Sequence, residues 1–159
     1  MAKPKLVDID ALDLGRILHG KDEIRRYCKQ RGRFEMLDAV VHEDHPGGVI
    51  VGYQDLKLDA WWAEDHIPGR PIFPGVLQAE GAAQLCTFDF LRRNPAMEGK
   101  FIGFAGLNDT RFRGVVEPGR RMYWIGKVHR SRSTMFTYHA EGFVDRELVF
   151  ETEVMGVVL

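Results

Sequence analysis

The residues best suited to chemistry lie between positions 66 and 84. His66 carries an imidazole, which exchanges protons near neutral pH. Glu80 follows fourteen positions later, among alanines and a glycine in a segment expected to be helical. A carboxylate in such apolar surroundings is costly unless it is paired or protonated. His66 and Glu80 therefore offer a base and an acid that could move protons on one substrate.

The segment between these two residues contributes backbone donors and a positioning group. Pro74 and Gly75 precede the expected helix, whose first turn has free N–H groups and the positive end of the helix dipole. The N–H groups of Gly75 and Val76 could bind a carbonyl oxygen that becomes negative during a reaction. Gln84 lies four residues after Glu80, where its amide can hydrogen-bond the carboxylate. A plain helix start, with Glu80 merely reaching solvent, remains an alternative.

The elements that must position these residues follow from the apolar pattern. We expect a buried helix from Val76 to about Leu91, stopped before Pro95. Two strands should precede it, over 33–41 and 49–58, joined by a hairpin turn at Pro46-Gly47-Gly48. Four strands should follow, with the sequences FIGFAGLNDTRF, RRMYWIGKVH, TMFTYHAEGFV and ELVFETEVMGVVL. This order predicts an α+β fold in which an antiparallel sheet packs on one helix.

Length and composition fit one globular domain. The chain has 159 residues and a net charge of -1, which indicates neither nucleic acid nor a membrane as partner. Residues 1–32 form a polar lead-in with a short helix near 21–29, and 33–159 form the main domain. The sequence contains no apolar run long enough for a membrane span and no signal-peptide pattern. Cys28 and Cys86 do not form a CxxC pair, so we expect a cytoplasmic location without disulfides.

Other histidines give no metal pattern in the sequence. His42 and His45 flank two acidic residues in the expected hairpin turn, which we interpret as a solvated turn rather than a metal site. His19, His129 and His139 have no partner that the sequence reveals. We therefore predict neither a metal nor another cofactor.

Basic residues gather in one later segment. Between positions 111 and 132 arginine and lysine outnumber acidic residues, and the leading members are Arg111, Arg113, Arg120 and Arg121. This patch is either an ordinary solvated surface or a landing site for an acidic carrier protein. Nucleic acid is disfavoured, because no binding motif accompanies the charge.

The segment HIPGRPIFPGVL, starting at His66 and followed by Glu80 and Gln84, closely resembles the signature of the 3-hydroxyacyl-[acyl-carrier-protein] dehydratases. These are hotdog-fold enzymes of fatty acid synthesis. The fourteen-residue spacing is kept, and Glu rather than Asp at position 80 resembles the Z type more than the A type. The resemblance runs over 34–159. Asp65 and Ile67 depart from it, because the family has Gly and Phe beside the histidine.

The resemblance implies a hotdog fold, with a long central helix wrapped by the sheet, and a function. His66 would remove the C2 proton of a 3-hydroxyacyl thioester, Glu80 would help the hydroxyl leave as water, and Gly75 N–H would hold the thioester oxygen. It implies a phosphopantetheine-linked substrate on an acyl carrier protein, no cofactor, and a homodimer or trimer of dimers. In each site His66 of one chain would meet Glu80 of the other. A hotdog thioesterase and a non-catalytic acyl-carrier-binding homologue remain alternatives.

Overall fold

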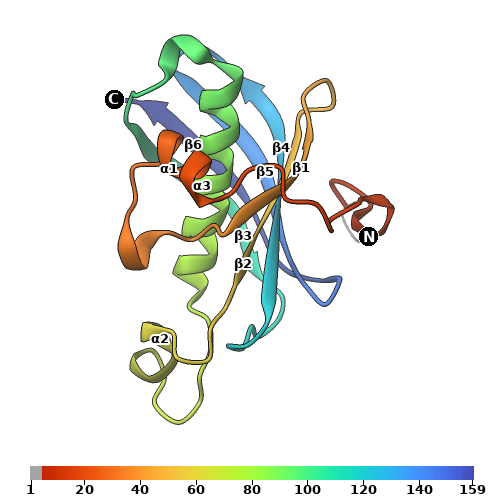
Figure 1. Ribbon diagram of the computed structural model, residues 1–159, viewed down its shortest axis with the longest axis vertical. Helices are drawn as coiled ribbons and strands as arrows, with labels where there is room; N and C mark the ends of the chain where they lie inside the picture. The colour runs from red at the N-terminus through yellow and green to blue at the C-terminus, as the bar shows by residue number, and fades with distance from the viewer. Residues whose placement is uncertain (1–4) are drawn as a thin grey trace.

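The computed structural model describes residues 5–159, which form one antiparallel sheet with a long helix across one face (Figure 1). The helices are α1 (Lys21–Tyr27), α2 (Trp61–Asp65) and α3 (Gly75–Arg93), with 3-10 turns at Ile9–Ala11, Gly32–Phe34 and Pro95–Met97. The strands are β1 (Ala39–Asp44), β2 (Val49–Asp55), β3 (Ile102–Phe112), β4 (Arg121–Ser131), β5 (Met135–Val144) and β6 (Glu147–Val158). Their order in the sheet is β1-β2-β4-β5-β6-β3. The expected α+β hotdog arrangement is confirmed.

Helix α3 begins and ends where the sequence gives the strongest signals. The Leu77 and Gln78 N–H groups donate to the Pro74 carbonyl at 3.0 and 3.1 Å, which starts the helix directly after the proline. The helix ends at Arg93, two residues before Pro95, because proline cannot continue it. The predicted helix from Val76 to about Leu91 is therefore confirmed, with slightly wider limits.

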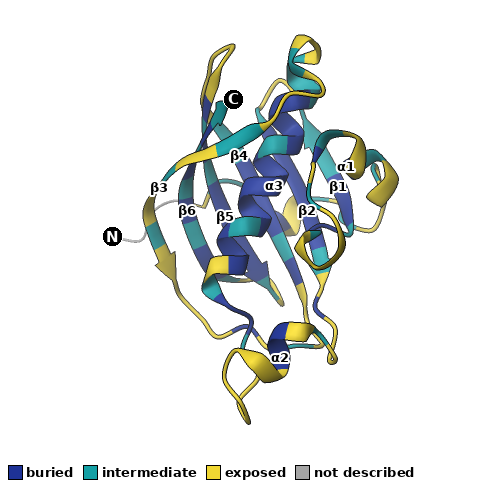
Figure 2. Cartoon of the chain, turned by 90° about the vertical axis from the view of Figure 1, so that its left-hand side faces the viewer, coloured by how far each residue is buried: buried dark blue, intermediate teal, exposed yellow. Residues whose placement is uncertain are grey.

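The helix lies close against the sheet at Gly81. A Cβ atom at this position would overlap the buried ring of Trp124 on β4, so only glycine permits this approach. The Trp124 indole N–H donates to the Gln78 carbonyl at 3.0 Å. One helical turn before Arg93, buried Asp89 accepts a hydrogen bond from the Tyr138 hydroxyl at 2.7 Å. Figure 2 shows α3 as a mostly buried helix against the sheet.

The first hairpin differs in part from its prediction. The turn at Pro46-Gly47-Gly48 is confirmed, but the strand expected over 33–41 is wrong over 33–38, because β1 begins at Ala39. The Phe34 carbonyl and the Met36 N–H form hydrogen bonds with the Gln84 side chain instead of with a neighbouring strand. The segment His42–Asp44 belongs to β1, so its interpretation as part of the turn is wrong, and the turn starts at His45.

The lead-in packs on the sheet rather than extending into solvent. Ile9 joins an apolar cluster with Val41, Val51 and Phe143, whose side chains alternate with those that face α3. The start of the lead-in therefore covers part of the sheet face opposite the helix, while α1 packs against α3 through Ile24. Residues 1–4 of the predicted lead-in lie outside the described part of the chain. No described helix has the length and apolar content needed to span a membrane.

Candidate active site

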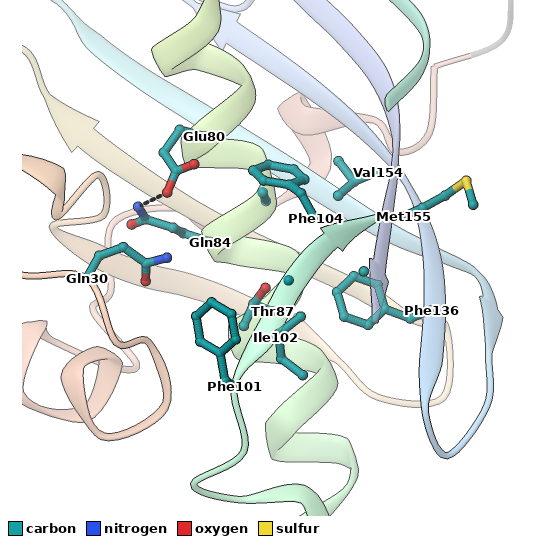
Figure 3. A pocket seen from close by; sticks show the side chains of 13 residues that line it. Gln30, Glu80, Gln84, Thr87, Phe101, Ile102, Phe104, Phe136, Val154 and Met155 are labelled. Atoms are coloured by element: carbon teal, nitrogen blue, oxygen red, sulfur yellow. Dashed lines mark hydrogen bonds between the residues drawn. The ribbon is translucent and has the colours of Figure 1, made fainter. Parts of the chain in front are cut away.

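Glu80 is half-buried on α3 and is held by Gln84. The Gln84 amide nitrogen donates to a Glu80 carboxylate oxygen at 2.8 Å (Figure 3). The same amide also donates to the Phe34 carbonyl at 2.7 Å, and its oxygen accepts the Met36 N–H at 3.0 Å. Three hydrogen bonds therefore fix the buried Gln84 side chain, which in turn fixes the direction of the Glu80 carboxylate. The i,i+4 spacing predicted the first of these bonds but not the other two.

The Glu80 carboxylate lines a pocket of about 140 Å³ between α3, β3 and β6. Figure 3 shows that its other walls are mostly apolar, and they include Phe101, Phe104, Phe136 and Val154. Gln30, Gln84 and Thr87 also line the pocket, so that apolar and polar groups surround Glu80 together. Such a lining suits a substrate with an acyl chain and a polar reactive centre. Sequence reasoning missed these wall residues, because the strand register that brings β3 and β6 beside Glu80 is a tertiary property.

His66 ends α2 and is exposed, with its ring orientation set by the backbone. The ring Nδ1 atom lies 2.8 Å from the Ile72 carbonyl oxygen. A carbonyl only accepts hydrogen bonds, so Nδ1 must carry the hydrogen in this contact. In the neutral imidazole, Nε2 then presents its lone pair. His66 is thus arranged as a base at Nε2.

The loop between His66 and α3 is anchored by two buried aromatic residues. Trp62 and Phe73 lie against each other with ring centroids 5.0 Å apart. The Phe73 N–H donates to the Val116 carbonyl at 2.7 Å, which joins this loop to the connection between β3 and β4. Gly69 has a φ of 78°, a left-handed conformation that favours glycine. These contacts restrict the loop that carries His66.

The start of α3 presents backbone donors at an exposed turn. Leu77 and Gln78 already donate to the Pro74 carbonyl, whereas Gly75 and Val76 precede the first intrahelical bond. The Phe112 ring also contacts this turn, and a Cβ atom on Gly75 would lie 2.7 Å from two of its atoms. Gly75 therefore lies directly against the exposed Phe112 ring, a contact that the sequence did not reveal.

A single chain does not gather the whole predicted site in one cavity. Among the described residues, Glu80 and Gln84 line the pocket under β3, but His66 does not line it. His66 directly follows α2, at the start of the loop that leads to Gly75, the first residue of α3. Within the described chain, the Glu80 pocket is thus formed without His66.

The four predicted patch arginines are exposed and flank the connection between β3 and β4. Arg113 pairs with Glu151 at 3.0 Å, Arg120 with an aspartate at 3.1 Å, and Arg121 with an aspartate at 2.6 Å. Bonding to Glu151 raises the pKa of Arg113. Arg111 is the member of this group for which the described residues show no ion pair. The net positive charge of the patch is thus smaller than the sequence suggested.

Known proteins match both the sequence and the fold. The model of the FabA-like domain matches residues 29–153. A Desulfotalea psychrophila protein named 3-hydroxyacyl-[acyl-carrier-protein] dehydratase FabZ is 37% identical over 125 residues, covering 77% of this chain and 82% of that protein. The proteins of the same name from Teredinibacter turnerae and Campylobacter jejuni are 36% and 32% identical, and cover 84% and 86% of this chain and 92% and 95% of their own lengths.

Solved structures share the fold at low sequence identity. The dehydratase heterocomplex ApeI:P from Xenorhabdus doucetiae has a TM-score of 0.72 at 11% identity, with 86% of this chain and 90% of that chain covered. A homologue of HP0420 from Helicobacter felis has a TM-score of 0.60 at 16% identity, with 87% and 86% covered. At these identities the structures support the fold alone. The family match and the three relatives show that this chain belongs to the FabA-like domain family, among its FabZ-type dehydratases.

Proposed function

We propose that the protein dehydrates 3-hydroxyacyl thioesters carried by an acyl carrier protein to trans-2-enoyl thioesters, in fatty acid or related acyl-chain synthesis. The observation that carries the proposal is that two side chains are oriented by their neighbours, one as a base and the other as an acid. His66 has its Nε2 lone pair set by the Ile72 carbonyl, and Glu80 is held in an apolar pocket by Gln84. The FabZ-named relatives act on this substrate class according to their names.

The reaction follows from these orientations. Neutral His66 takes the C2 proton at Nε2. The electron pair of that C–H bond is first shared with the thioester oxygen and then forms the C2–C3 double bond as the hydroxyl leaves. The C3 hydroxyl leaves as water with the proton of Glu80, which must therefore start as the neutral acid. The Gly75 N–H at the helix start binds the thioester oxygen while it carries negative charge. Transfer of the proton from His66 back to Glu80 restores both residues without a cofactor.

The reacting pair comes together in a homodimer, alone or within a trimer of dimers. β3 is an edge strand of the sheet and leaves its backbone groups available to a second copy. Large apolar side chains on or beside this strand are exposed, namely Phe101, Phe104, Leu107, Phe112 and Val115. Pairing of two β3 strands would cover them and bring the His66 loop of one chain over the Glu80 pocket of the other. The partner would also enlarge a pocket that is small for a ligand.

The substrate is delivered by an acyl carrier protein in the cytoplasm. The patch arginines lie in or beside the connection between β3 and β4, which contacts the His66 loop through Val116. An acidic carrier docked there would reach the site with its phosphopantetheine arm. Arg111→Glu should raise KM for the carrier-linked substrate but not for a small thioester. Arg16→Glu, an exposed change in the lead-in, is the matched control. An equal KM change on both substrates would contradict carrier docking at this patch.

One assay separates the proposal from its alternatives. The purified protein is incubated with 3-hydroxybutyryl and crotonyl thioesters, and the products are identified. Enoyl product from the first substrate, and hydrated product from the second, is expected for a dehydratase. Release of free thiol would instead indicate a hotdog thioesterase. Absence of both reactions would indicate a non-catalytic acyl-carrier-binding protein.

A further inference from the structure

Three potential metal ligands converge on the sheet face opposite α3. His129, His139 and Glu153 lie on the adjacent strands β4, β5 and β6. One ligand atom from each lies within 4.8 Å of the other two. The two imidazole centroids are 4.6 Å apart, and His139 Nδ1 is 3.7 Å from a Glu153 carboxylate oxygen. The three positions are separated along the chain, so no local sequence pattern marks this cluster.

The strand register explains why the cluster forms. His139 and Glu153 are direct partners across β5 and β6. The β4–β5 register shifts between Val128 and Arg130, and His129 lies within this irregularity. Tyr138 and its alternate neighbours face α3, so His139 points away from the helix. The cluster is therefore on the opposite side of the sheet from Glu80.

Glu153 is also held by a neighbouring side chain. The Asn108 amide on β3 donates to Glu153 Oε1 at 3.0 Å. Its other oxygen, Oε2, is the one nearest His139. A hydrogen bond to a carboxylate ligand is the kind of support that orients ligands in metal sites. Asn108 would thus direct Oε2 toward the two imidazoles.

We propose that His129, His139 and Glu153 bind one Zn²⁺ ion. Two imidazole nitrogens and a carboxylate oxygen are a ligand set that zinc accepts, with water in the fourth position. Bond lengths of about 2.0–2.1 Å place tetrahedral ligand atoms about 3.3 Å apart. Small side-chain rotations of exposed His129 and half-buried Glu153 would bring the observed cluster to this spacing. The ion ties β4, β5 and β6 together and takes no part in the dehydration.

Metal titration tests the site. Tag-free, chelator-treated protein is titrated with Zn²⁺ by calorimetry and with Co²⁺ by visible absorption, which reports coordination directly. One ion per chain is expected. His129→Ala should weaken binding by at least about tenfold, and Asn108→Ala by about tenfold through the lost support of Glu153. His45→Ala, an equally exposed histidine in the hairpin turn, is the matched control and should bind like the wild type.

Thermal unfolding gives a second readout that does not depend on activity. Zn²⁺ should raise Tm of the wild type and of His45→Ala, but not that of His129→Ala, because only a ligand of the folded state stabilises it. Metal-free His129→Ala should unfold at the wild-type temperature, which shows that it folds. Turnover should be the same with and without Zn²⁺. Absence of Zn²⁺ binding, or equal binding by wild type and His129→Ala, would overturn the proposal whatever the outcome of the dehydratase assay.

Discussion

At the scale of single residues, backbone-anchored contacts prepare the two proposed reacting groups. The Ile72 carbonyl fixes which nitrogen of His66 presents its lone pair. Gln84, itself bonded to two backbone groups, fixes the carboxylate of Glu80. Such anchoring reduces the reorganisation needed when a substrate binds, which is a major source of catalytic efficiency. The chemistry thus depends on neighbours as much as on His66 and Glu80.

Removing either reacting group should abolish most of the activity without loss of the fold. His66→Ala and Glu80→Gln should each lower kcat by about 10² to 10⁴, the usual contribution of a general acid or base. Steady-state kinetics on a 3-hydroxyacyl thioester measures the loss, and circular dichroism verifies the fold. Glu64→Gln, an exposed carboxylate on α2 near His66, should keep wild-type turnover. Near-full turnover in either site variant would remove that residue from the mechanism.

At the scale of elements, the position of α3, and with it of Glu80, is set by the contact between Gly81 and the Trp124 ring on β4. The Trp124 ring is fully buried and donates to the Gln78 carbonyl, so it has little room to move. At an exposed helix position, replacing glycine by alanine would stabilise the helix by about 1 kcal/mol. Here the overlap with Trp124 adds an overpacking cost of typically about 1–3 kcal/mol. The overlap with Trp124 should therefore determine the sign of the change in the free energy of unfolding.

Gly81→Ala should therefore destabilise the protein. We expect the free energy of unfolding to fall by up to about 2 kcal/mol, as the difference between the overpacking cost and the helix gain. Urea unfolding at one fixed protein concentration measures it, since association also affects the midpoint. Gly15→Ala, at an exposed position in the lead-in, should change the value by less than about 0.5 kcal/mol. A stabilised Gly81→Ala protein would mean that α3 does not lie this close to the sheet.

A second contact fixes the later part of α3. The Tyr138 hydroxyl donates to the buried Asp89 carboxylate, and burial with this neighbouring charge raises the pKa of Tyr138 so that the hydroxyl keeps its proton. Tyr138→Phe should lower the free energy of unfolding by about 1–3 kcal/mol, because the buried carboxylate loses a donor. The Tyr123 hydroxyl accepts a long hydrogen bond of 3.5 Å from Arg121, its one contact of this kind within residues 5–159, so Tyr123→Phe should have little effect. Equal unfolding midpoints for both variants would contradict a stabilising role of the Asp89 contact.

The limits of sequence-based prediction are visible in particular elements. The limits of α3 followed from Pro74 and from the residues after Arg93, which are local signals. α2 was not predicted, because the five residues from Trp61 to Asp65 are too few to show a helical period. The strand expected over 33–41 is wrong over 33–38, because Gln84, far along the chain, hydrogen-bonds to backbone groups of this segment. Local patterns predicted the helix, whereas long-range contacts decided the exceptions.

The candidate site was predictable in its residue types but not in its surroundings. His66, Glu80 and Gln84 stood out by spacing and by resemblance to a family. The Phe101 and Phe104 walls, the cluster at His129 and the ion pairs of the arginines required the strand register, which the apolar pattern does not determine. A sequence thus indicates which groups can react more readily than which groups surround them.

At the scale of the whole molecule, the β3 edge of the sheet has no neighbouring strand within residues 5–159, whereas the rest of the sheet is largely covered. α3 covers one face, the lead-in covers part of the other, and His19 pairs with Val40 at the β1 edge (Figures 1 and 2). The β3 edge keeps exposed apolar side chains beside the Glu80 pocket. The proposed dimer would cover this edge and supply the missing base. The assembly, rather than the single chain, would then be the catalytic unit.

A site shared between two chains is tested most directly by mixing two inactive variants. His66→Ala and Glu80→Gln chains are unfolded together in equal amounts, refolded, and assayed for dehydration. Random pairing makes about half of the dimers mixed, and each mixed dimer has one intact site and one doubly damaged site. Activity should return to about a quarter of the wild-type value, while each variant refolded alone stays inactive. A refolded mixture of correct dimer size with no recovered activity would show that both residues of a site come from one chain.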